Sequence, residues 1–568
     1  MNREKNTFKI NRKRIYFLFI LFLIAFSLIS YRLVSIQYLD ASKYQGYAQF
    51  QHTDEFKLYS KRGKILDRNG IELAISLIEK TVYANPQEVL DPSYQAEVLS
   101  GLLNINKEEL ESKLGDKDLG FVYLKRKIAA EEAEEIARLG LHGIYIQDET
   151  KRYYPQEQLA AQIIGFTGTD NNGLYGVEIQ YESILRGVDG KAVAEKDVFG
   201  NILPGNIKSY IDPVDGKDIM LTIDSQIQYI TEKNLEEVCV KYNAPGATAI
   251  VMDPNSGEIF AMATYPGFDP NNYQDYEAEV YKAGGISFTY EPGSTFKIIN
   301  VAGALENNTV GKDQVFDLPS SIRVSDRVIK ELFRTSNIQL STREIVQHSS
   351  NVGAVILALS MGDKLYWENI NEFGFGQATG IELPGEENGI LHDYKTWPAS
   401  TIGALAIGQS ISVTPLQLLR AVSSIANGGY LVRPTIIKEI ELNRDSGSEE
   451  PHNNMTEIIS SSTAGTVKEI MLAVVENGTG INAQIDGVGV CGKTGTAEKA
   501  NKNGIGYSEG RSITSFVGFA PYEDPKVAII VVVDEPTGKE RTVWGGTVAA
   551  PIFKIIMEYS LNRLKVLK

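Results

Sequence analysis

The sequence predicts an α+β protein with one membrane-spanning helix near its amino terminus and two folded parts after it. Three observations predict this class. A long apolar run follows a cluster of basic residues at the start of the chain. Short strand-like and helix-like stretches alternate with glycine-containing turns from about residue 40 to residue 212. From residue 216 onward, helices alternate with meandering strands, the pattern of an antiparallel sheet flanked by helices.

The apolar run extends from Ile15 to Tyr31 and continues through Leu33 and Val34, because the long side chain of Arg32 can reach the membrane surface. Its length of about 20 residues is enough to cross a bilayer. Basic residues before a span favour the cytoplasm, so we expect a cytoplasmic tail at 1–14, an anchor at 15–34 and an external remainder. A cleaved signal peptide is the alternative, but the run is long for one and no small-x-small cleavage site follows. The basic residues are Arg3, Lys5, Lys9, Arg12, Lys13 and Arg14.

The first folded part is expected to be mixed α+β and to lack a catalytic site. Its clearest helix is Ala129–Leu139, which has acidic residues early, Arg138 late and Gly140 as its stop. The charged group formed by Arg62-Gly63 and Asp67-Arg68 is interpreted as a buried ion-pair corner, the alternative being a site. The expected strands are Lys64–Leu66, Thr81–Ala84 and Gly143–Gln147.

The second folded part begins with Asp224, a good N-cap for a helix over Ser225–Val240. Two apolar stretches around the turn Asp253–Gly257 then predict a β-hairpin. The polar stretch Asn443–Asn454 is expected to be a solvent loop, and a final helix is expected from about Pro551 to Leu564. The expected strands are Ala247–Met252, Glu258–Thr264, Val488–Ala497, Ser512–Phe519 and Val527–Val533.

The composition excludes several classes of function. The chain has 568 residues and a net charge of −16, which argues against nucleic acid as a partner because phosphate binding needs a basic face. The two cysteines, Cys239 and Cys491, are too few for a disulfide framework or a structural zinc site, and are expected to be buried thiols. The histidines show no metal spacing, so no metal site is expected.

Ser294 and Lys297 are the first candidate catalytic residues. Glu291-Pro292-Gly293 interrupts the chain before Ser294, and Thr295–Leu305 can be helical, so the serine is expected at a helix amino terminus, where free N–H groups favour developing negative charge. Lys297 lies three residues later on the same helix face. A serine hydroxyl needs a base, and a lysine amine serves if desolvation or a neighbouring positive charge, such as Lys493, makes it neutral. The alternative is an N-cap serine beside a surface lysine.

Ser349-Ser350-Asn351 is the second run of candidate residues. Together with Ser294, it offers a hydroxyl, that of Ser349, to relay a proton and an amide, that of Asn351, to grip a substrate peptide. Taken alone, such a polar triplet is usually a loop or a cap. The neighbouring His348 is interpreted as a packed or exposed histidine and not as a general base.

Lys493-Thr494-Gly495-Thr496 is the third run, and it is expected on a strand. Gly495 has no Cβ, so a ligand backbone is expected to approach the strand there. The two threonines offer hydroxyls to a carboxylate, and main-chain N–H groups near Thr496 and Ser294 would form an oxyanion hole. Alone, this run is a strand that ends in a turn. The order and wide separation of the three runs favour one shared function, acyl transfer.

At these three runs the chain resembles the class B penicillin-binding proteins, the monofunctional peptidoglycan transpeptidases. The likeness covers nearly the whole chain beyond the anchor. It implies an elongated, non-catalytic pedestal (dimerisation) domain at 40–212 and a transpeptidase (penicillin-binding) domain at 216–568, with a five-stranded antiparallel sheet flanked by helices. The run Tyr290–Ser294 is more similar to the septal and sporulation branch than to the elongation branch. The other matching segments are Arg62–Gly70, Arg152–Pro155, Gly173–Glu178, Arg186–Gly190, Gly374–Gly376, Leu383–Glu386, Gly408-Gln409 and Val413–Pro415.

The resemblance implies a reaction for these residues. Ser294 attacks the carbonyl between the last two D-alanines of a peptidoglycan stem peptide, Lys297 takes its proton, and D-alanine leaves with a proton from Ser349. An amine of a neighbouring stem then attacks the acyl-enzyme, which forms the cross-link. The implied substrate-binding residues are Asn351, which steadies the peptide, and the strand residues Lys493, Thr494, Gly495 and Thr496, whose lysine and threonines hold the terminal carboxylate.

No metal or organic cofactor is implied. The implied partners are stem peptides, β-lactam antibiotics that acylate Ser294, the bacterial cell membrane, a membrane glycan polymerase, and division or sporulation proteins. The catalytic domain is expected to be extracytoplasmic on a single-pass anchor. The alternatives are a D,D-carboxypeptidase, with water as the acceptor, and a non-enzymatic β-lactam sensor or divisome scaffold. A scaffold is expected to lose parts of the site, and this sequence retains them.

Overall fold

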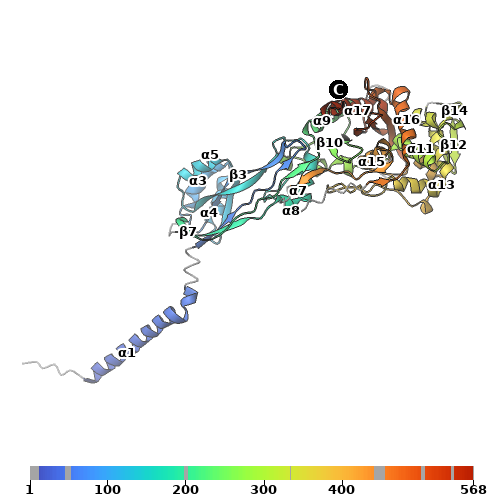
Figure 1. Ribbon diagram of the computed structural model, residues 1–568. Coiled ribbons are helices and arrows are strands. Elements are labelled where there is room, and N and C mark those ends of the chain that lie inside the picture. The colour runs from blue at the N-terminus through green and yellow to red at the C-terminus, as the bar shows by residue number, and fades with distance from the viewer. Residues whose placement is uncertain are drawn as a thin grey trace, which may run out of the picture. The chain divides into compact units, whose positions relative to one another are not determined.

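A computed structural model describes residues 12–44, 53–196, 202–332, 334–440, 455–500, 506–538 and 543–566 (Figure 1). The chain divides into two compact units. The first unit takes the chain up to Ser60 together with Val188–Val214, and the second takes Lys61–Gly187 and Asp215–Lys568. The expected loop at Asn443–Asn454 lies outside the described residues.

The first unit holds the predicted apolar helix, α1 (Arg12–Val34), which a short π-helical turn, η1 (Ser35–Leu39), extends. Its apolar side chains are exposed, and its mean hydropathy reaches 2.3. By length and composition it is able to cross a membrane. The same unit contains a three-stranded antiparallel sheet in the order β1-β6-β7. Its strands are β1 (Thr53–Leu58), β6 (Gly190–Lys196) and β7 (Ile202–Ile211).

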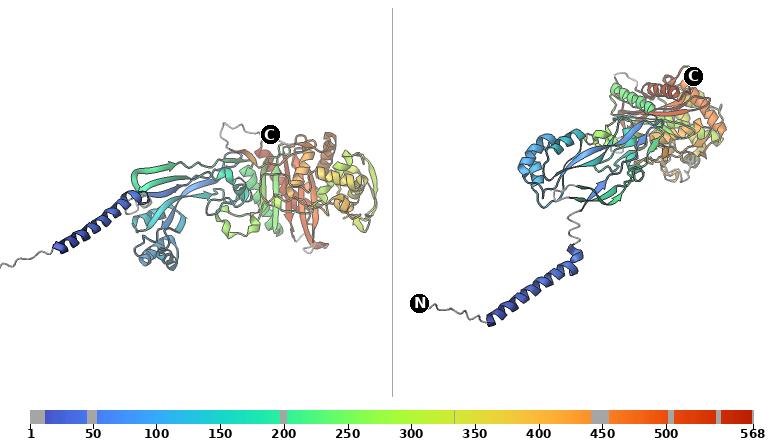
Figure 2. Two further views of the ribbon diagram at one scale, coloured as in Figure 1. Left: turned by 90° about the horizontal axis from the view of Figure 1, so that it is seen from below. Right: turned by 60° about the vertical axis from the view of Figure 1, so that its left-hand side comes forward.

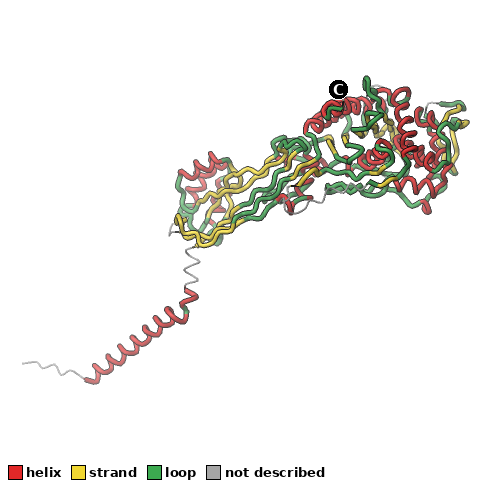
Figure 3. The backbone as a smooth tube through the Cα atoms, viewed as in Figure 1, coloured by secondary structure: helices red, strands yellow, loops and turns green. Residues whose placement is uncertain are grey.

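The second unit starts with a sheet around one long strand, β3 (Glu72–Ala84), which pairs antiparallel with both β4 and β5. The predicted strand Thr81–Ala84 is the end of β3. Two predicted strands are confirmed as β2 (Ile65–Leu66) and the longer β5 (Ile144–Tyr153), and the predicted helix as α5 (Ala130–Arg138). Helices α3 to α5 lie beside one end of the long strands (Figure 3). The remaining elements are β4 (Val122–Ile128), α3 (Pro92–Leu103), α4 (Lys107–Gly115), α6 (Ala161–Ile164), α7 (Gly176–Gln180) and α8 (Glu182–Leu185).

The structure confirms the predicted buried ion-pair corner, but the carboxylates that pair with Arg62 and Arg68 come from other parts of the sequence. Arg62 and Arg152, both nearly inaccessible to solvent, donate to the two carboxylate oxygens of fully buried Glu178 at 2.5 and 2.6 Å. Asp67 instead accepts from the Ser225 hydroxyl at 2.6 Å, and Arg68 pairs with Glu258. Three of the segments that carry the family resemblance therefore meet at one buried carboxylate.

A five-stranded antiparallel sheet, in the order β10-β9-β20-β19-β18, forms the centre of the later part of this unit, which confirms the predicted fold class. The predicted hairpin is β9 and β10, and all three later strands form close to their expected positions. Strand β18 begins at Cys491, three residues later than expected. The strands are β9 (Gly246–Met252), β10 (Ile259–Tyr265), β18 (Cys491–Ala500), β19 (Tyr507–Ala520) and β20 (Val527–Asp534).

Helices cover both faces of this sheet, so its strands are apolar along most of their length (Figure 2). Side chains alternate between the two faces along each strand. One face packs against α9 (Ser225–Tyr242) and α17 (Gly545–Arg563), the other against α15 (Pro415–Ala426) and α16 (Ser461–Asn477). The first face includes Val251, Ile529 and Val531, and the second Ile250, Ile530 and Val532.

The last helix corrects a prediction. We expected it to begin at about Pro551, but α17 begins at Gly545 and contains Pro551. A proline inside a helix leaves the carbonyl four residues earlier without its N–H partner. That carbonyl belongs to Thr547, and it accepts from the Tyr242 hydroxyl at 3.4 Å. The side chain comes from α9, so the sequence near Pro551 carries no sign of it.

The remaining elements of the second unit surround the sheet or link it to the preceding part. Strand β8 (Ile219–Leu221) joins β2 in parallel and β16 (Ile437–Ile440) in antiparallel, so one sheet contains strands from both parts. The other strands are β11 (Val315–Leu318), β12 (Ser321–Val324), β13 (Arg327–Lys330), β14 (Ile338–Ser341), β15 (Tyr430–Leu431) and β17 (Thr456–Glu457). The other helices are η2 (Pro270–Asp275), η3 (Ala278–Tyr281), α10 (Gly284–Ser287), η4 (Gly293–Phe296), α11 (Lys297–Glu306), α12 (Thr342–Gln347), α13 (Asn351–Glu372), η5 (Tyr394–Thr396), α14 (Thr401–Ala406) and η6 (Ile481–Ala483).

Glu178→Gln tests the buried corner. Removing the negative charge leaves the buried guanidinium group of Arg152 without its counter-ion and leaves Arg62 with Glu182 alone, so the free energy of unfolding should fall by about 3–5 kcal/mol. Chemical denaturation of the purified protein measures this. Glu134→Gln is the control, because Glu134 and its partner Arg138 are 70% and 76% exposed and the pair contributes little. Equal stability of wild type and Glu178→Gln would contradict a structural role for the corner.

Candidate active site

The nucleophile candidate lies where the sequence predicts, at the amino-terminal end of a helix. Ser294 is in the 3₁₀ turn η4, directly before α11, and its side chain is half-buried. Gly293 has φ +57°, and a Cβ there would lie 2.9 Å from the main-chain oxygen of Thr496. The N–H of Gly293 donates to the carbonyl of Gly408 at 3.1 Å. The turn that presents Ser294 is thus pressed against β18.

Lys297 is buried and makes three polar contacts. Its side chain is 1% exposed, and its Nζ lies 2.7 Å from the Ser349 carbonyl, 2.7 Å from Asn351 Oδ1 and 3.3 Å from Ser349 Oγ. The second predicted run therefore closes around the lysine of the first. Contacts between residues more than 50 positions apart are a product of the fold, since α11 packs against α13.

Ser349 lies between two lysines. Its Oγ is 3.0 Å from the Nζ of Lys493, which is completely buried. The backbone of Ser349 has φ +57°, a left-handed conformation that is uncommon for a residue with a side chain and costs of order 1–3 kcal/mol. The surrounding hydrogen bonds hold Ser349 in this conformation, which places its hydroxyl between the two lysine amines.

Burial lowers the pKa of both amines. The pKa of Lys297 falls to about 7, chiefly because the amine is desolvated, while the negative charge of Glu331 opposes that shift. The pKa of Lys493 falls well below its usual value, through burial and then through the nearby charge of Lys297. The sequence suggested that either desolvation or a neighbouring positive charge could make Lys297 neutral, and desolvation is the main cause. Since the amines repel each other, they titrate as a coupled pair.

Glu331, which follows β13, belongs to the site although no sequence motif includes it. Its carboxylate accepts from the Ser350 hydroxyl at 2.5 Å and from the N–H groups of Asn351 and Val352 at 3.2 and 3.1 Å. Arg334 pairs with it at 3.2 Å. Local sequence gives no signal that Glu331 belongs to the site, because the three donors at the start of α13 lie about 20 positions later.

The third predicted run is on β18, as expected, and its threonines contact residues that sequence reasoning missed. Thr494 Oγ1 is 2.9 Å from the hydroxyl oxygen of Thr479, which follows α16. Thr496 Oγ1 accepts from the N–H of Gly545, the first residue of α17, at 3.1 Å. The short glycine-rich stretch around Thr479 is a turn signal and carries no indication of this contact.

Gly495 has a packing role that the sequence did not indicate. A Cβ at Gly495 would lie 2.3 Å from Ser515 Oγ and 2.9 Å from the side chain of Thr295. Those atoms belong to β19 and to the turn of Ser294, so the missing Cβ lets β18 and the nucleophile turn pack together. The approach of a ligand backbone to the strand at Gly495 stays a prediction.

Ser294, Ser349, Thr494 and Thr496 line one cavity of about 430 Å³. Lys297, Lys493 and Asn351 reach this group through their contacts with Ser349 and with one another. His348 also lines the cavity and is exposed, as predicted. All three predicted runs therefore contribute side chains to one site.

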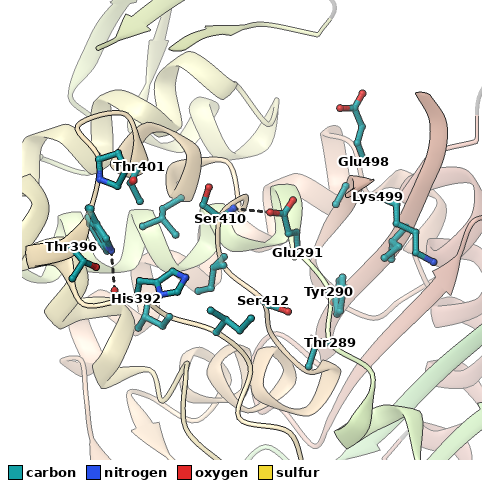
Figure 4. Close-up of a pocket in the computed structure, with 18 of the residues that line it drawn as sticks. Thr289, Tyr290, Glu291, His392, Thr396, Thr401, Ser410, Ser412, Glu498 and Lys499 are labelled. Carbon is teal, nitrogen blue, oxygen red and sulfur yellow. Dashed lines mark hydrogen bonds between the residues drawn. The ribbon is translucent and has the colours of Figure 1, made fainter. Parts of the chain in front are cut away.

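A second cavity, of about 790 Å³, adjoins the same strand and the segment that leads to Ser294 (Figure 4). Glu291 lines it, three residues before Ser294, and Glu498 lines it, two residues after Thr496. Glu291 Oε1 accepts from the Ser410 N–H at 2.8 Å, and burial raises the pKa of its carboxyl group. The site therefore has space beyond the cavity that holds Ser294.

In the part of the chain that the structure describes, potential metal ligands are dispersed and both thiols are buried. Among these residues, no group of three or more His, Cys, Asp or Glu side chains lies close enough together to hold a metal ion. Cys239 and Cys491 are buried free thiols, as predicted. Burial raises the pKa of both, that of Cys239 to about 12, which disfavours the reactive thiolate.

Comparison with known proteins agrees with this geometry. The family model "Penicillin binding protein transpeptidase domain" matches residues 247–558, and "Penicillin-binding Protein dimerisation domain" matches residues 57–221. Stage V sporulation protein D of Bacillus subtilis is 37% identical over 98% of this chain and 86% of its own length. Peptidoglycan D,D-transpeptidase FtsI of Escherichia coli K12 is 31% identical over 89% of this chain and 84% of its own.

Solved structures show the same similarity. A peptidoglycan synthetase from Bifidobacterium adolescentis is 29% identical and superposes with a TM-score of 0.72, covering 90% of this chain and 97% of that one. Penicillin-binding protein 3 from Mycobacterium tuberculosis, in complex with aztreonam, is 26% identical with a TM-score of 0.70, covering 90% and 98%. With its buried lysine pair and these matches over nearly its whole length, the chain belongs to the class B penicillin-binding proteins, the serine-type peptidoglycan D,D-transpeptidases.

Proposed function

We propose that this chain cross-links peptidoglycan stem peptides through an acyl-enzyme on Ser294, with release of D-alanine. The observation that carries the proposal is the convergence at Ser349, whose hydroxyl lies 3.3 Å from the amine of Lys297 and 3.0 Å from that of Lys493, on the cavity that Ser294 also lines. The three segments are far apart in the sequence. Acyl transfer by a serine requires such a set of groups.

Lys297 is the base that accepts the Ser294 proton. Two of its three contacts, the Ser349 carbonyl and Asn351 Oδ1, are oxygens that only accept. A neutral amine satisfies both with its two N–H groups and keeps its lone pair for a hydroxyl proton. The pKa of about 7 supports a substantial neutral fraction near neutral pH. The main-chain N–H groups of Ser294 and Thr496 stabilise the oxyanion of the tetrahedral intermediate.

Strand β18 holds the terminal carboxylate of the stem peptide. Lys493, Thr494 and Thr496 offer one amine and two hydroxyls, while Gly495 lets the strand lie against the nucleophile turn. Ser349 passes a proton to the departing D-alanine, since its hydroxyl touches both amines. Asn351 steadies the peptide: its amide donates to the Lys330 carbonyl at 3.0 Å, and the second N–H of the same group is left for substrate.

Membrane attachment and cellular role follow as further parts of the proposal. Residues 1–14 form a cytoplasmic tail, 15–34 the anchor, 40–212 the pedestal and 216–568 the extracytoplasmic transpeptidase domain. The apolar helix and the relatives named above support this arrangement. A membrane glycan polymerase supplies the glycan strands. The relatives support a role in septal or sporulation wall synthesis, and fluorescence localisation in dividing and sporulating cells distinguishes the two.

Ser294→Ala tests the nucleophile. β-Lactams imitate the D-Ala-D-Ala end, and the aztreonam complex of the mycobacterial relative supports their binding here. The variant should lose covalent labelling by a fluorescent penicillin, because no ester can form, and it should keep the wild-type melting temperature. Gel fluorescence measures the label. Undiminished labelling of Ser294→Ala would remove this serine from its proposed role.

The rate of penicillin acylation should depend on pH with an acidic limb near pH 7. Below the Lys297 pKa of about 7 the amine carries a proton and cannot accept that of Ser294, so the rate should fall about tenfold per pH unit. Stopped-flow measurement of acylation between pH 5 and pH 8 tests this, with melting temperatures across the same range as the control. A flat profile would argue against Lys297 as the base.

The products distinguish cross-linking from hydrolysis. Incubation with a stem-peptide analogue and an amine acceptor should yield a cross-linked dimer together with D-alanine, since the acyl-enzyme reacts with the amine. A D,D-carboxypeptidase would release D-alanine without dimer, and a sensor or scaffold would release neither. Mass spectrometry of the reaction separates these outcomes, and Ser294→Ala serves as the blank.

A further inference from the structure

The amino terminus of α13 carries Ser349 and Asn351 to the catalytic amines, and one carboxylate outside the three motif runs holds it there. Glu331 has a side chain that is only 8% exposed, and it lines the same cavity as Ser294. It accepts hydrogen bonds from the Ser350 hydroxyl and from two successive main-chain N–H groups, those of Asn351 and Val352. The free N–H groups of a helix amino terminus favour a negative charge at this position.

The directions of these hydrogen bonds are determined by chemistry. The Ser350 hydroxyl accepts from the Gly353 N–H at 3.0 Å, so its single proton is available for Glu331. The main-chain N–H groups can only donate, and so can Arg334. The carboxylate therefore faces four hydrogen-bond donors, one of which, Arg334, is a cation.

Asn351 connects this carboxylate to the catalytic base. Its N–H donates to Glu331 Oε2 at 3.2 Å, while its Oδ1 lies 2.7 Å from Lys297 Nζ. One residue thus contacts both the buried anion and the buried amine. The negative charge of Glu331 also opposes the effect of desolvation on Lys297.

Three other charged or titratable side chains belong to this site. Lys493 approaches from β18, Arg334 is paired with Glu331, and the exposed His348 lines the cavity from the end of α12. Two amines that must be buried and partly charged need a nearby anion, because burial without one costs several kcal/mol per ion. Within the described part of the site, Glu331 is the carboxylate that contacts the segment between the amines.

We propose that Glu331 is a positioning residue of the acylation reaction: it holds the first turn of α13 against the two lysines and supplies the negative charge that balances their shared positive charge. This rests on the proposed role of Lys297 as the base. Glu331 touches neither Ser294 nor a substrate group in this arrangement, and it acts through Asn351 and Ser350.

Two substitutions that should shift the acidic limb of the pH profile in opposite directions test the proposal. Glu331→Gln removes the charge and keeps the size of the side chain. The pKa of Lys297 should then fall, because an anion favours the protonated amine, and the acidic limb of penicillin acylation should move to lower pH by about one unit. Arg334→Gln leaves the Glu331 charge uncompensated, so the same limb should move to higher pH. Both are measured on the full-length chain in detergent with a fluorescent penicillin.

Glu306→Gln is the matched control. Glu306 also accepts from the start of a helix, through the N–H and hydroxyl of Ser460 before α16, and it contacts neither catalytic lysine. The acidic limb of penicillin acylation in Glu306→Gln should match that of the wild type. A purely structural role for Glu331 would lower the acylation rate at every pH and leave the limb in place.

The outcomes separate this inference from the proposed function. A wild-type limb near pH 7 that is unchanged in Glu331→Gln, or that moves in the same direction in both variants, overturns the role of Glu331 alone. Absence of the limb in the wild type overturns Lys297 as the base. Should Glu331→Gln fail to fold, as judged by its melting curve, the upward shift in Arg334→Gln decides the proposal by itself.

Discussion

Two lysine amines are buried beside a single serine hydroxyl, and the rest of the site is arranged to make this possible. Removing an ammonium group from water costs several kcal/mol, so both amines cannot be buried and fully charged at neutral pH. Hydrogen-bond acceptors surround Lys297, and the anion Glu331 lies nearby. The two lysine amines also titrate as a coupled pair. The lowered pKa that makes a lysine useful as a base is therefore a consequence of burial.

The five-stranded sheet provides the rigidity that this arrangement needs. Its strands are buried on both faces, so β18 cannot shift without disturbing the packing of helices on either side. The turn of Ser294 rests directly on β18, where Gly293 and Gly495 leave no Cβ between the two backbones. Motion of Ser294 relative to Lys493 is thus limited by backbone contact.

Predictions from the sequence succeeded where a structural feature depends on residues close together in the chain. The strands of the central sheet, the N-cap of α9 and the positions of the three motif runs depend on hydrophobic patterning and on residues within a few positions of each other. Prediction from the sequence failed at Pro551, because the Tyr242 hydroxyl that satisfies Thr547 comes from a helix about 300 positions earlier. It also gave no sign that, at Gly495, the space of a Cβ is taken by β19 and by the turn of Ser294.

The sequence by itself determined the kinds of groups in the site and their order along the chain: a serine and lysine one helical turn apart, a serine with an asparagine, and a lysine strand with two threonines. Tertiary structure alone decided that the Ser349 hydroxyl lies between two amines and that Glu331 and Thr479 join them. The physical reason is that desolvation and charge coupling depend on distances between segments, and no local pattern records which segments will be packed together.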